Sequence, residues 1–268
     1  MALTQEEKAQ RFRELHRGET FVIPNPWDAG AAKVLAGLGF KALATTSSGF
    51  AFTLGRLDGG ATLDEVAAHV ALLSEATEVP LSVDLENGYG RAPEDAARAI
   101  TRAGKAGAVG GSIEDWDRDD GRLYELAEAR ERIAAAEEAA KALAFPFTLT
   151  ARAENFLREN PDLDDTIARL RAYEEAGADV LFAPGLRTAE EVGAICGSVS
   201  KPVNVLGSPR LGMTVEEIAA AGAQRISVGG GLTWAAVDAA IEVAERIIDD
   251  GDFSGLSTPG RVREWLAR

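Results

Sequence analysis

The stretch AGADVL, residues 176–181, decides the fold of this 268-residue chain. A helix-forming segment precedes it, Gly177 is the kind of residue that ends a helix in the left-handed conformation, and an apolar run follows. Three other stretches repeat the phrase: LGFKAL at 38–43, AGAVGG at 106–111 and AGAQRI at 221–226. The recurrence predicts a unit of helix, glycine stop and buried strand that is used several times along the chain.

Eight strand–helix units can be counted along the sequence. The predicted strands cover residues 21–26, 41–47, 81–86, 108–115, 147–154, 178–184, 202–207 and 225–231. Short apolar strands that alternate with helices indicate a parallel sheet, and eight units are the number in a (β/α)8 barrel. The competing fold, a doubly wound open sheet, usually has fewer strands and a glycine-rich loop after the first. Here the first strand ends in Pro24-Asn25-Pro26-Trp27, so we predict an α/β fold with a single TIM-type barrel.

We expect one domain over residues 1–268, with an N-terminal helix at 1–20, the barrel at 21–249 and a tail helix at 250–268. Barrels of about 250 residues commonly form one unit. The tail contains Trp265, a large residue beyond the completed barrel. It predicts an extra C-terminal helix that packs either against its own barrel or, swapped, against another subunit.

The composition excludes several classes of function. A net charge of −15 argues against a nucleic-acid-binding surface, which needs clustered Lys and Arg. No apolar run approaches the roughly 20 residues that cross a bilayer, and the charged start of the chain lacks the apolar core of a secretory signal. The single cysteine, Cys196, allows neither an internal disulfide nor a multi-cysteine metal site. We therefore expect a cytoplasmic protein that binds neither membrane nor nucleic acid.

Polar side chains gather where the predicted strands end, which is the edge where barrel enzymes carry their chemistry. The strand starts are apolar or bland. The polar strand ends comprise Thr45, Thr46, Ser47 and Ser48 on the second strand, Asp84 and Glu86 on the third, Glu114 and Asp115 on the fourth, Arg152 and Glu154 on the fifth, and Asn204 on the seventh. This distribution predicts a site at the C-terminal mouth of the barrel.

Asp84, Glu86 and Glu114 form the central group of this predicted site. Residues 84 and 86 point to one side if the strand stays extended, and Glu114 comes from the neighbouring strand. Three adjacent carboxylates repel one another unless a cation or a counter-charged side chain lies among them. An all-oxygen set suits Mg2+ rather than zinc, and the two histidines, His16 and His69, fall in helical segments. The alternative is a set of helix caps and surface salt bridges.

Arg152 lies within the fifth predicted strand, where a charged side chain is costly unless it is paired. Its forked guanidinium suits a carboxylate held through two hydrogen bonds, so it is a candidate substrate clamp. The alternative is a structural ion pair with Glu154 or with the metal-site carboxylates. The neighbouring run Thr46-Ser47-Ser48 offers hydroxyl and backbone N–H groups able to cradle an anion.

Eight landmarks occur in order along the chain: PNPWDAGAAKVL, ATTSSGFAFTLGRLDG, VDLENGYG, SIEDW, TARAENFL, GADVLFAPG, KPVNV and ISVGGG. Together they resemble the isocitrate lyase and phosphoenolpyruvate mutase superfamily, in particular its smaller phosphonomutase-like, methylisocitrate lyase-like and oxaloacetate decarboxylase-like members. The resemblance covers residues from about 20 to 235. Relatives are commonly oligomers that exchange a C-terminal helix, so the resemblance implies a homodimer or homotetramer.

The resemblance also implies roles for individual residues. Asp84 matches the direct Mg2+ ligand of the family, and Glu86 and Glu114 look like carboxylates that hold the metal through water, although many relatives have Asp at position 86. Arg152 looks like the arginine that faces the 2-oxo acid, and Asp58 matches an active-site aspartate suited to handle a proton or a water. The implied catalytic residues are Asp58, Arg152 and Glu114, and the implied substrate-binding residues are Trp27, Thr46, Ser47, Ser48, Arg152 and Asn204.

One departure from the family changes the expected chemistry. Its lyases carry a mobile loop after the fourth strand with a Lys-Arg-Cys-Gly-His type motif, whereas this chain reads DWDRDDGRLYE at 115–125. Cleavage of isocitrate or methylisocitrate by the usual route is therefore in doubt. The loop, with Gly121 as a hinge, could still close over the site and exclude water.

The remaining expectation is a Mg2+-dependent lyase, with Mn2+ as a substitute ion. Such an enzyme breaks a C–C bond of an oxaloacetate-like 2-oxo acid, by cleavage or decarboxylation, through an enolate that the metal stabilises. Two alternatives stay open. One is C–P chemistry on a phosphonate, of the phosphoenolpyruvate mutase or phosphonopyruvate hydrolase type, and the other is a non-catalytic barrel that binds a carboxylate.

Overall fold

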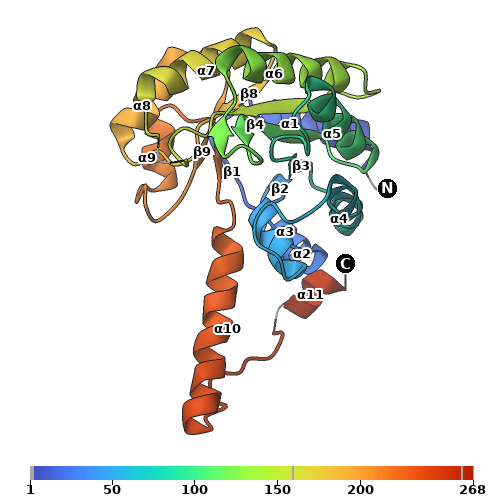
Figure 1. Ribbon diagram of the computed structural model, residues 1–268. Helices are drawn as coiled ribbons and strands as arrows, with labels where there is room; N and C mark the ends of the chain where they lie inside the picture. Colours follow the sequence, from blue (N-terminus) through green and yellow to red (C-terminus); the bar gives the residue numbers. More distant parts are fainter. Residues whose placement is uncertain (1–2, 159, 261, 268) are drawn as a thin grey trace.

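The computed structural model describes residues 3–158, 160–260 and 262–267. Its centre is a parallel eight-stranded sheet in the order β1-β10-β9-β8-β7-β4-β3-β2, surrounded by helices (Figure 1). The Ala44 N–H, in β2, donates to the Pro24 carbonyl, just after β1, at 3.1 Å. This hydrogen bond joins the two ends of the strand order, so the sheet forms a nearly closed barrel. The predicted TIM-type fold is confirmed.

Each of the eight predicted strands is present, with narrower bounds than the sequence pattern indicates. The barrel strands are β1 (Phe21–Ile23), β2 (Leu43–Ala44), β3 (Leu81–Asp84), β4 (Gly110–Glu114), β7 (Thr148–Arg152), β8 (Val180–Phe182), β9 (Val203–Leu206) and β10 (Arg225–Ser227). The difference that matters for the site is in β3, which ends at Asp84 instead of residue 86. Glu86 has a left-handed φ of 50°, which an extended strand does not accommodate. Asp84 and Glu86 therefore do not share one side of a continuous strand.

A helix follows each barrel strand, and several of these helices begin at a capping threonine. The helices are α1 (Gln5–Leu15), α2 (Ala29–Gly37), α3 (Ser47–Thr53), α4 (Leu63–Ala76), α5 (Pro93–Lys105), α6 (Leu126–Lys141), α7 (Leu163–Glu175), α8 (Ala189–Ser198), α9 (Val215–Ala220), α10 (Gly231–Asp250) and α11 (Val262–Leu266). The hydroxyls of Thr46, Thr62, Thr188 and Thr214 accept hydrogen bonds from the first turns of α3, α4, α8 and α9. They satisfy N–H groups that a helix start leaves free.

The glycine stops predicted from the repeated phrase are confirmed. Gly39, Gly107, Gly177 and Gly222 all have φ between 100° and 108°, a region that residues with a Cβ rarely adopt. Each glycine reverses the chain between the end of a helix and the start of the next strand. The local sequence therefore specifies where the chain turns back into the barrel.

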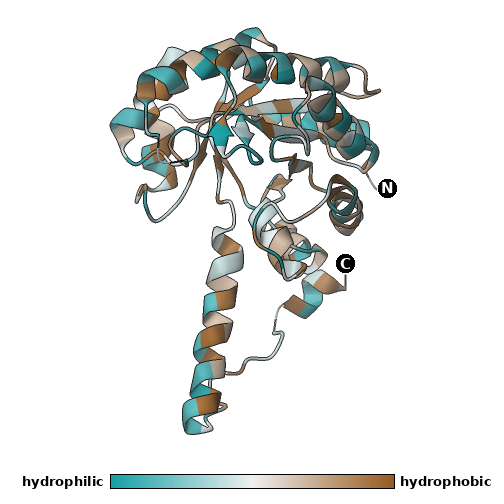
Figure 2. Ribbon diagram, viewed as in Figure 1, coloured by the Kyte–Doolittle hydropathy of each residue, from teal (hydrophilic) through white to brown (hydrophobic). Residues whose placement is uncertain are grey.

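Apolar side chains pack between the strands and the surrounding helices, and Figure 2 shows brown, apolar residues along the central strands. A second, smaller cluster closes the barrel interior from the side of α1. It consists of Ala9, Phe12, Ile23, Ala42 and Val109. Because this end is filled, a ligand can enter the barrel only from the carboxyl ends of the strands.

The segment predicted as a mobile loop after the fourth barrel strand contains a small antiparallel hairpin. Its strands are β5 (Trp116–Asp117) and β6 (Arg122–Leu123). Arg91, in the loop after β3, pairs with Asp117 at 3.0 Å and with Asp120 at 2.7 Å. The hairpin is thus anchored beside the carboxyl end of β3.

Helix α10 projects away from the barrel (Figure 1), and Thr233 is the only buried residue among its described positions. Helix α11 returns to the same barrel and packs on α2. The Gly37 α-carbon lies so close to the Trp265 ring that a β-carbon there would be 2.5 Å from a ring atom, and Lys33 Nζ donates to the Leu266 carbonyl at 3.2 Å. The last helix therefore contacts its own barrel, whereas α10 does not cover it. None of the helices in the described ranges has the length and apolar content of a membrane span.

Arg132, in α6, is 1% exposed and fixes the loop that follows β3. Its guanidinium stacks over the Tyr124 ring at 4.5 Å. It also donates to four backbone carbonyls of that loop, those of Asn87, Gly90, Arg91 and Ala92. One buried side chain thus satisfies four backbone acceptors, which orders the segment that carries Glu86.

We predict that Arg132→Met lowers the free energy of unfolding by about 3 kcal/mol, because four backbone carbonyls of the loop lose the hydrogen bonds from this buried side chain. Urea denaturation followed by circular dichroism measures this loss. Arg130→Met, at an exposed position of the same helix, is the matched control and should change stability by about 0.5 kcal/mol or less. Equal effects of the two substitutions would show that Arg132 does not hold the loop.

Candidate active site

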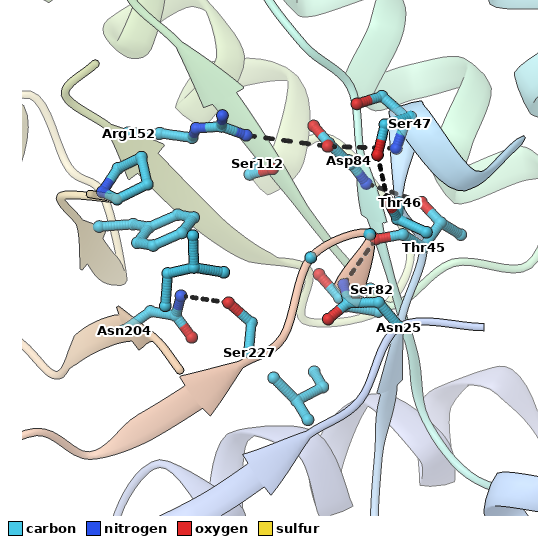
Figure 3. A pocket seen from close by; sticks show the side chains of 18 of the residues that line it. Asn25, Thr45, Thr46, Ser47, Ser82, Asp84, Ser112, Arg152, Asn204 and Ser227 are labelled. Carbon is cyan, nitrogen blue, oxygen red and sulfur yellow. Dashed lines mark hydrogen bonds and ion pairs between the residues drawn. The ribbon is translucent and has the colours of Figure 1, made fainter. Parts of the chain in front are cut away.

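A cavity of about 190 Å3 lies inside the barrel toward the carboxyl ends of the strands (Figure 3). Barrel interiors are normally filled by layers of branched apolar side chains. Here much of the lining is polar and small, which leaves room for a ligand. The polar lining residues are Asn25, Thr45, Thr46, Ser47, Ser48, Asp58, Ser82, Asp84, Ser112, Arg152, Asn204, Arg225 and Ser227.

Seven of the ten site residues predicted from the sequence line this cavity. They are Asp58, Asp84, Arg152, Asn204, Thr46, Ser47 and Ser48. The other three, Trp27, Glu86 and Glu114, do not line it. The structure therefore gathers most of the predicted mouth, and of the three predicted metal-site carboxylates only Asp84 is among the residues that line this cavity.

Asp84 ends β3 with its carboxylate at the cavity wall. Oδ2 lies 3.7 Å from Arg152 Nη1 and 3.4 Å from the Ser47 N–H, and Oδ1 accepts the Glu86 N–H at 3.1 Å. The Asp84 N–H donates to Thr45 Oγ1 at 2.9 Å, which ties the end of β3 to β2. The long contacts to Oδ2 leave that oxygen free to take a stronger ligand.

Glu86 is buried, but it points away from the cavity to a separate set of partners. Its carboxylate forms an ion pair with Arg118 of the hairpin loop and accepts the Tyr89 hydroxyl at 3.2 Å. Burial, followed by the repulsion of Asp84, raises the pKa of Glu86 to about 7. The prediction that it lies beside Asp84 on one strand is wrong, because the chain turns left-handed at this position.

Glu114, at the end of β4, is buried behind the cavity wall. Its carboxylate lies 3.3 Å from Arg152 Nη1 and 3.6 Å from Arg158 Nη2. Burial raises its pKa well above the usual value although the two arginines oppose this shift. The structure thus places Glu114 as a partner of Arg152 and leaves it no open edge toward the cavity.

Arg152, at the end of β7, both lines the cavity and compensates buried acids. Beyond Asp84 and Glu114, its Nε pairs with Glu154, and its Cζ lies 5.5 Å from the Phe182 ring centroid. Burial disfavours the charged form, but the three carboxylates outweigh it and raise the pKa of Arg152. Arg152 therefore forms the ion pairs with Glu154 and the neighbouring carboxylates that were given as the structural alternative. It also lines the cavity, as expected of a residue that binds a substrate carboxylate.

The geometry fits Mg2+ as a hydrated ion held mainly by Asp84. Within the described ranges, no three His, Cys, Asp or Glu side chains are arranged to hold one ion. Mg2+ commonly keeps several waters and binds through one or two carboxylates. Asp84 is such a carboxylate, and the hydroxyls of Thr45, Ser47 and Ser112 in the same cavity are oxygen partners for bound water.

The run Thr46-Ser47-Ser48 starts α3 at the cavity wall, with Thr46 Oγ1 accepting the Gly49 N–H at 3.3 Å and lying 3.2 Å from Ser48 Oγ. Trp27 packs behind this segment. Its Cβ would be 3.1 Å from a β-carbon at position 49, so only glycine lets the two segments approach. Trp27 is therefore placed to support the segment rather than to line the cavity.

Several residues of the site were not predicted from the sequence. Asn25 joins β1 to its neighbours, since Nδ2 donates to the Thr45 carbonyl at 2.8 Å and Oδ1 accepts the Val228 N–H at 2.9 Å. Arg158 pairs with Glu154 at 2.9 Å. Arg225 begins β10 and lines the cavity. The expectation that strand starts carry no functional polar residue is therefore wrong for β10. A charged residue inside a strand, the signal that identified Arg152, also marks Arg225.

Comparisons with known proteins agree with this site. The profile of phosphoenolpyruvate phosphomutase matches residues 12–248. The solved structure of a candidate lyase/mutase from Burkholderia cenocepacia J2315 is 50% identical, covers 98% of this chain and 97% of its own, and superposes with a TM-score of 0.94. Oxaloacetate decarboxylase of Rhodopseudomonas palustris (strain BisA53) is 33% identical over 206 residues, which are 73% of this chain and 69% of the relative.

A third relative is an oxaloacetate acetylhydrolase, solved with its product oxalate and separately with the inhibitor 3,3-difluorooxalacetate. Its oxalate complex is 27% identical, covers 97% of this chain and 94% of its own, and has a TM-score of 0.88. The profile match over most of the chain and these relatives confirm the resemblance drawn from the eight landmarks. The chain belongs to the phosphoenolpyruvate phosphomutase family, within the PEP mutase/isocitrate lyase superfamily.

Proposed function

We propose that this protein is a Mg2+-dependent lyase that breaks a C–C bond of an oxaloacetate-like 2-oxo acid through an enolate. The observation that carries the proposal is the pair of Asp84 and Arg152 at one cavity wall (Figure 3). It offers a ligand for a cation and a forked donor for a substrate carboxylate within the same small space. The oxaloacetate decarboxylase and oxaloacetate acetylhydrolase among the relatives support this substrate class.

Mg2+ bound at Asp84 would act as a Lewis acid that withdraws electrons from the substrate carbonyl, and Mn2+ suits the same oxygen donors. Arg152 binds and orients the substrate carboxylate, and its raised pKa keeps it cationic. Glu114 acts through Arg152, because its ion pair at 3.3 Å fixes the guanidinium. Asn204 and the run Thr46-Ser47-Ser48 supply further hydrogen bonds to the substrate.

Decarboxylation is the C–C cleavage that these residues serve best. The bond to the leaving carboxylate breaks, its electron pair becomes part of the enolate, and CO2 departs without a base. One proton must then reach the carbon from solvent water, and we assign its relay to Asp58, on the exposed rim of the cavity. The segment 115–125 holds no Cys, His or Lys, so the cysteine acid of the family's lyase loop is not part of the proposed reaction.

The proposed activity is tested by incubating the purified protein and Mg2+ with oxaloacetate and measuring pyruvate above the spontaneous rate. Phosphonopyruvate, with release of phosphate or formation of phosphoenolpyruvate as readout, distinguishes C–P chemistry. Activity on phosphonopyruvate alone would replace the proposal with the C–P alternative. Binding without turnover across a panel of 2-oxo acids would favour a non-catalytic barrel.

We also propose that the protein is a homo-oligomer in which a second copy covers α10. Trp234, Ile241 and Ile248 are 42%, 48% and 80% exposed. They are spaced seven residues apart, so they share one face of the helix. A long helix that projects from the barrel with an apolar face exposed favours a protein partner, and a second copy agrees with the homo-oligomer that the resemblance implies.

For the metal, Asp84→Asn should lower kcat/KM by on the order of 100-fold or more and weaken Mg2+ binding, because a neutral amide replaces the main ligand. Steady-state kinetics and isothermal titration calorimetry measure the two effects. Asp119→Asn removes one charge from an exposed position and should change neither. Full activity of Asp84→Asn, or of the wild-type protein in EDTA, would refute the metal-dependent proposal.

For the clamp, Arg152→Lys keeps the charge but loses the fork, so kcat/KM should fall by about 10- to 100-fold. The comparison is made at saturating Mg2+ with circular dichroism to confirm folding. Arg98→Lys, on the exposed side of α5, is the control. Unchanged kinetics with Arg152→Lys would return this residue to a purely structural role.

For the oligomer, Ile241→Glu combined with Ile248→Glu should reduce the molar mass measured by light scattering, because two charges would enter the apolar contact. Ala239→Glu adds a charge elsewhere on α10 and should disturb assembly less. A wild-type protein that elutes as a monomer at micromolar concentration would contradict the proposed assembly.

A further inference from the structure

Arg225 places a positive charge deep inside the barrel, below the residues assigned to the mouth. It begins β10, is 5% exposed and lines the same cavity as Asp84 and Arg152. Its Nη2 donates to Thr150 Oγ1, in β7, at 2.9 Å. The guanidinium therefore spans the barrel interior between two non-adjacent strands and forms part of the cavity floor.

The partners of this guanidinium in the described ranges are neutral. Nε donates to Asn204 Oδ1 at 2.8 Å, and Nη1 lies 3.2 Å from His16 Nε2. His16 does not carry a compensating or competing charge at neutral pH, because burial and then Arg225 lower its pKa to about 3. Arg152 is different, since three carboxylates surround it.

A buried cation without an anion is costly, and this cation also has unused donors. A guanidinium carries five N–H groups, whereas three hydrogen bonds are formed with the described residues. Burial lowers the pKa of Arg225 to about 9, so it remains charged at neutral pH. An anionic group in the cavity would compensate the charge and occupy the free donors.

Asn204 and Ser227 extend this floor toward the mouth. Asn204 Nδ2 donates to Ser227 Oγ at 2.9 Å (Figure 3). Asn204 Oδ1 accepts a hydrogen bond from Arg225 Nε at 2.8 Å. Arg225 thereby fixes which end of the Asn204 amide donates. Small side chains of Ser82 and Ser112 leave the neighbouring part of the cavity open.

We propose that Arg225, with Asn204 and Ser227, forms a second anion subsite that receives a carboxylate of the substrate distant from the one at Arg152. The inference rests on the proposed function and assigns the residues that bind the second carboxylate of its oxaloacetate-like substrate. A monocarboxylic 2-oxo acid would leave the buried charge of Arg225 without an anion. The substrate class is therefore a short 2-oxo dicarboxylate.

The experiment compares two probes by isothermal titration calorimetry in the presence of Mg2+. Oxalate has two directly bonded carboxylate carbons, whereas in 3,3-difluorooxalacetate two further carbons separate the second carboxylate from the first. Arg225→Gln should weaken binding of 3,3-difluorooxalacetate by about 10- to 100-fold, the range for a lost charged hydrogen bond, and change oxalate binding by less than about twofold. Arg225→Lys, which keeps the charge, should recover part of the lost affinity.

A second variant covers the case in which Arg225→Gln does not fold. Ser227→Asp supplies an internal carboxylate beside Asn204, so it should preserve or raise the melting temperature while weakening 3,3-difluorooxalacetate by a similar factor. The subsite would be overturned if a variant lost the same affinity for oxalate as for 3,3-difluorooxalacetate. It would also be overturned if neither Arg225→Gln nor Ser227→Asp changed the affinity for either probe. Failure of the wild-type protein to bind oxalate with Mg2+ would instead count against the proposed function, so the two failures are distinguishable.

Discussion

The buried charge of Arg152 is the interaction on which the candidate site depends. A guanidinium inside a barrel is tolerated only with compensating anions, and Glu154, Glu114 and Asp84 provide them. Of these three, only Asp84 also lines the cavity. The network therefore does two things at once. It keeps Arg152 cationic, and it leaves one carboxylate at the wall where a cation and a substrate carboxylate can meet.

The electrostatic environment differs between the two ends of the cavity, because Arg152 is paired with carboxylates and Arg225 with neutral groups. At the mouth, the chain itself supplies the anions around Arg152. At the floor, the partners of Arg225 among the residues that the structure describes are neutral, namely Thr150, Asn204 and a histidine that burial keeps neutral. The chain has a net charge of −15, yet the buried cation Arg225 has no carboxylate partner among the described residues.

The fold could be predicted from the sequence because its signals are local. A glycine with φ above 100° after a helix is visible in phrases such as AGADVL, and the strands that follow are continuous apolar runs. Parallel strands all end at the same face, so the position of Asp84, Arg152 and Asn204 at one cavity followed from the strand count. Asp58 lies in a loop and carries no such periodic signal. It was identified by resemblance to a family.

The sequence by itself determined the barrel, the mouth and the residues at the strand ends. Only the tertiary structure decided which of those residues line the cavity. Glu86 turns away because packing imposes a left-handed backbone and a distant arginine, Arg118, captures it, and Glu114 is drawn behind the wall by Arg152 and Arg158. These ion pairs join segments that are far apart in the chain, and their geometry depends on how deeply each group is buried. The local sequence around each residue does not show this burial.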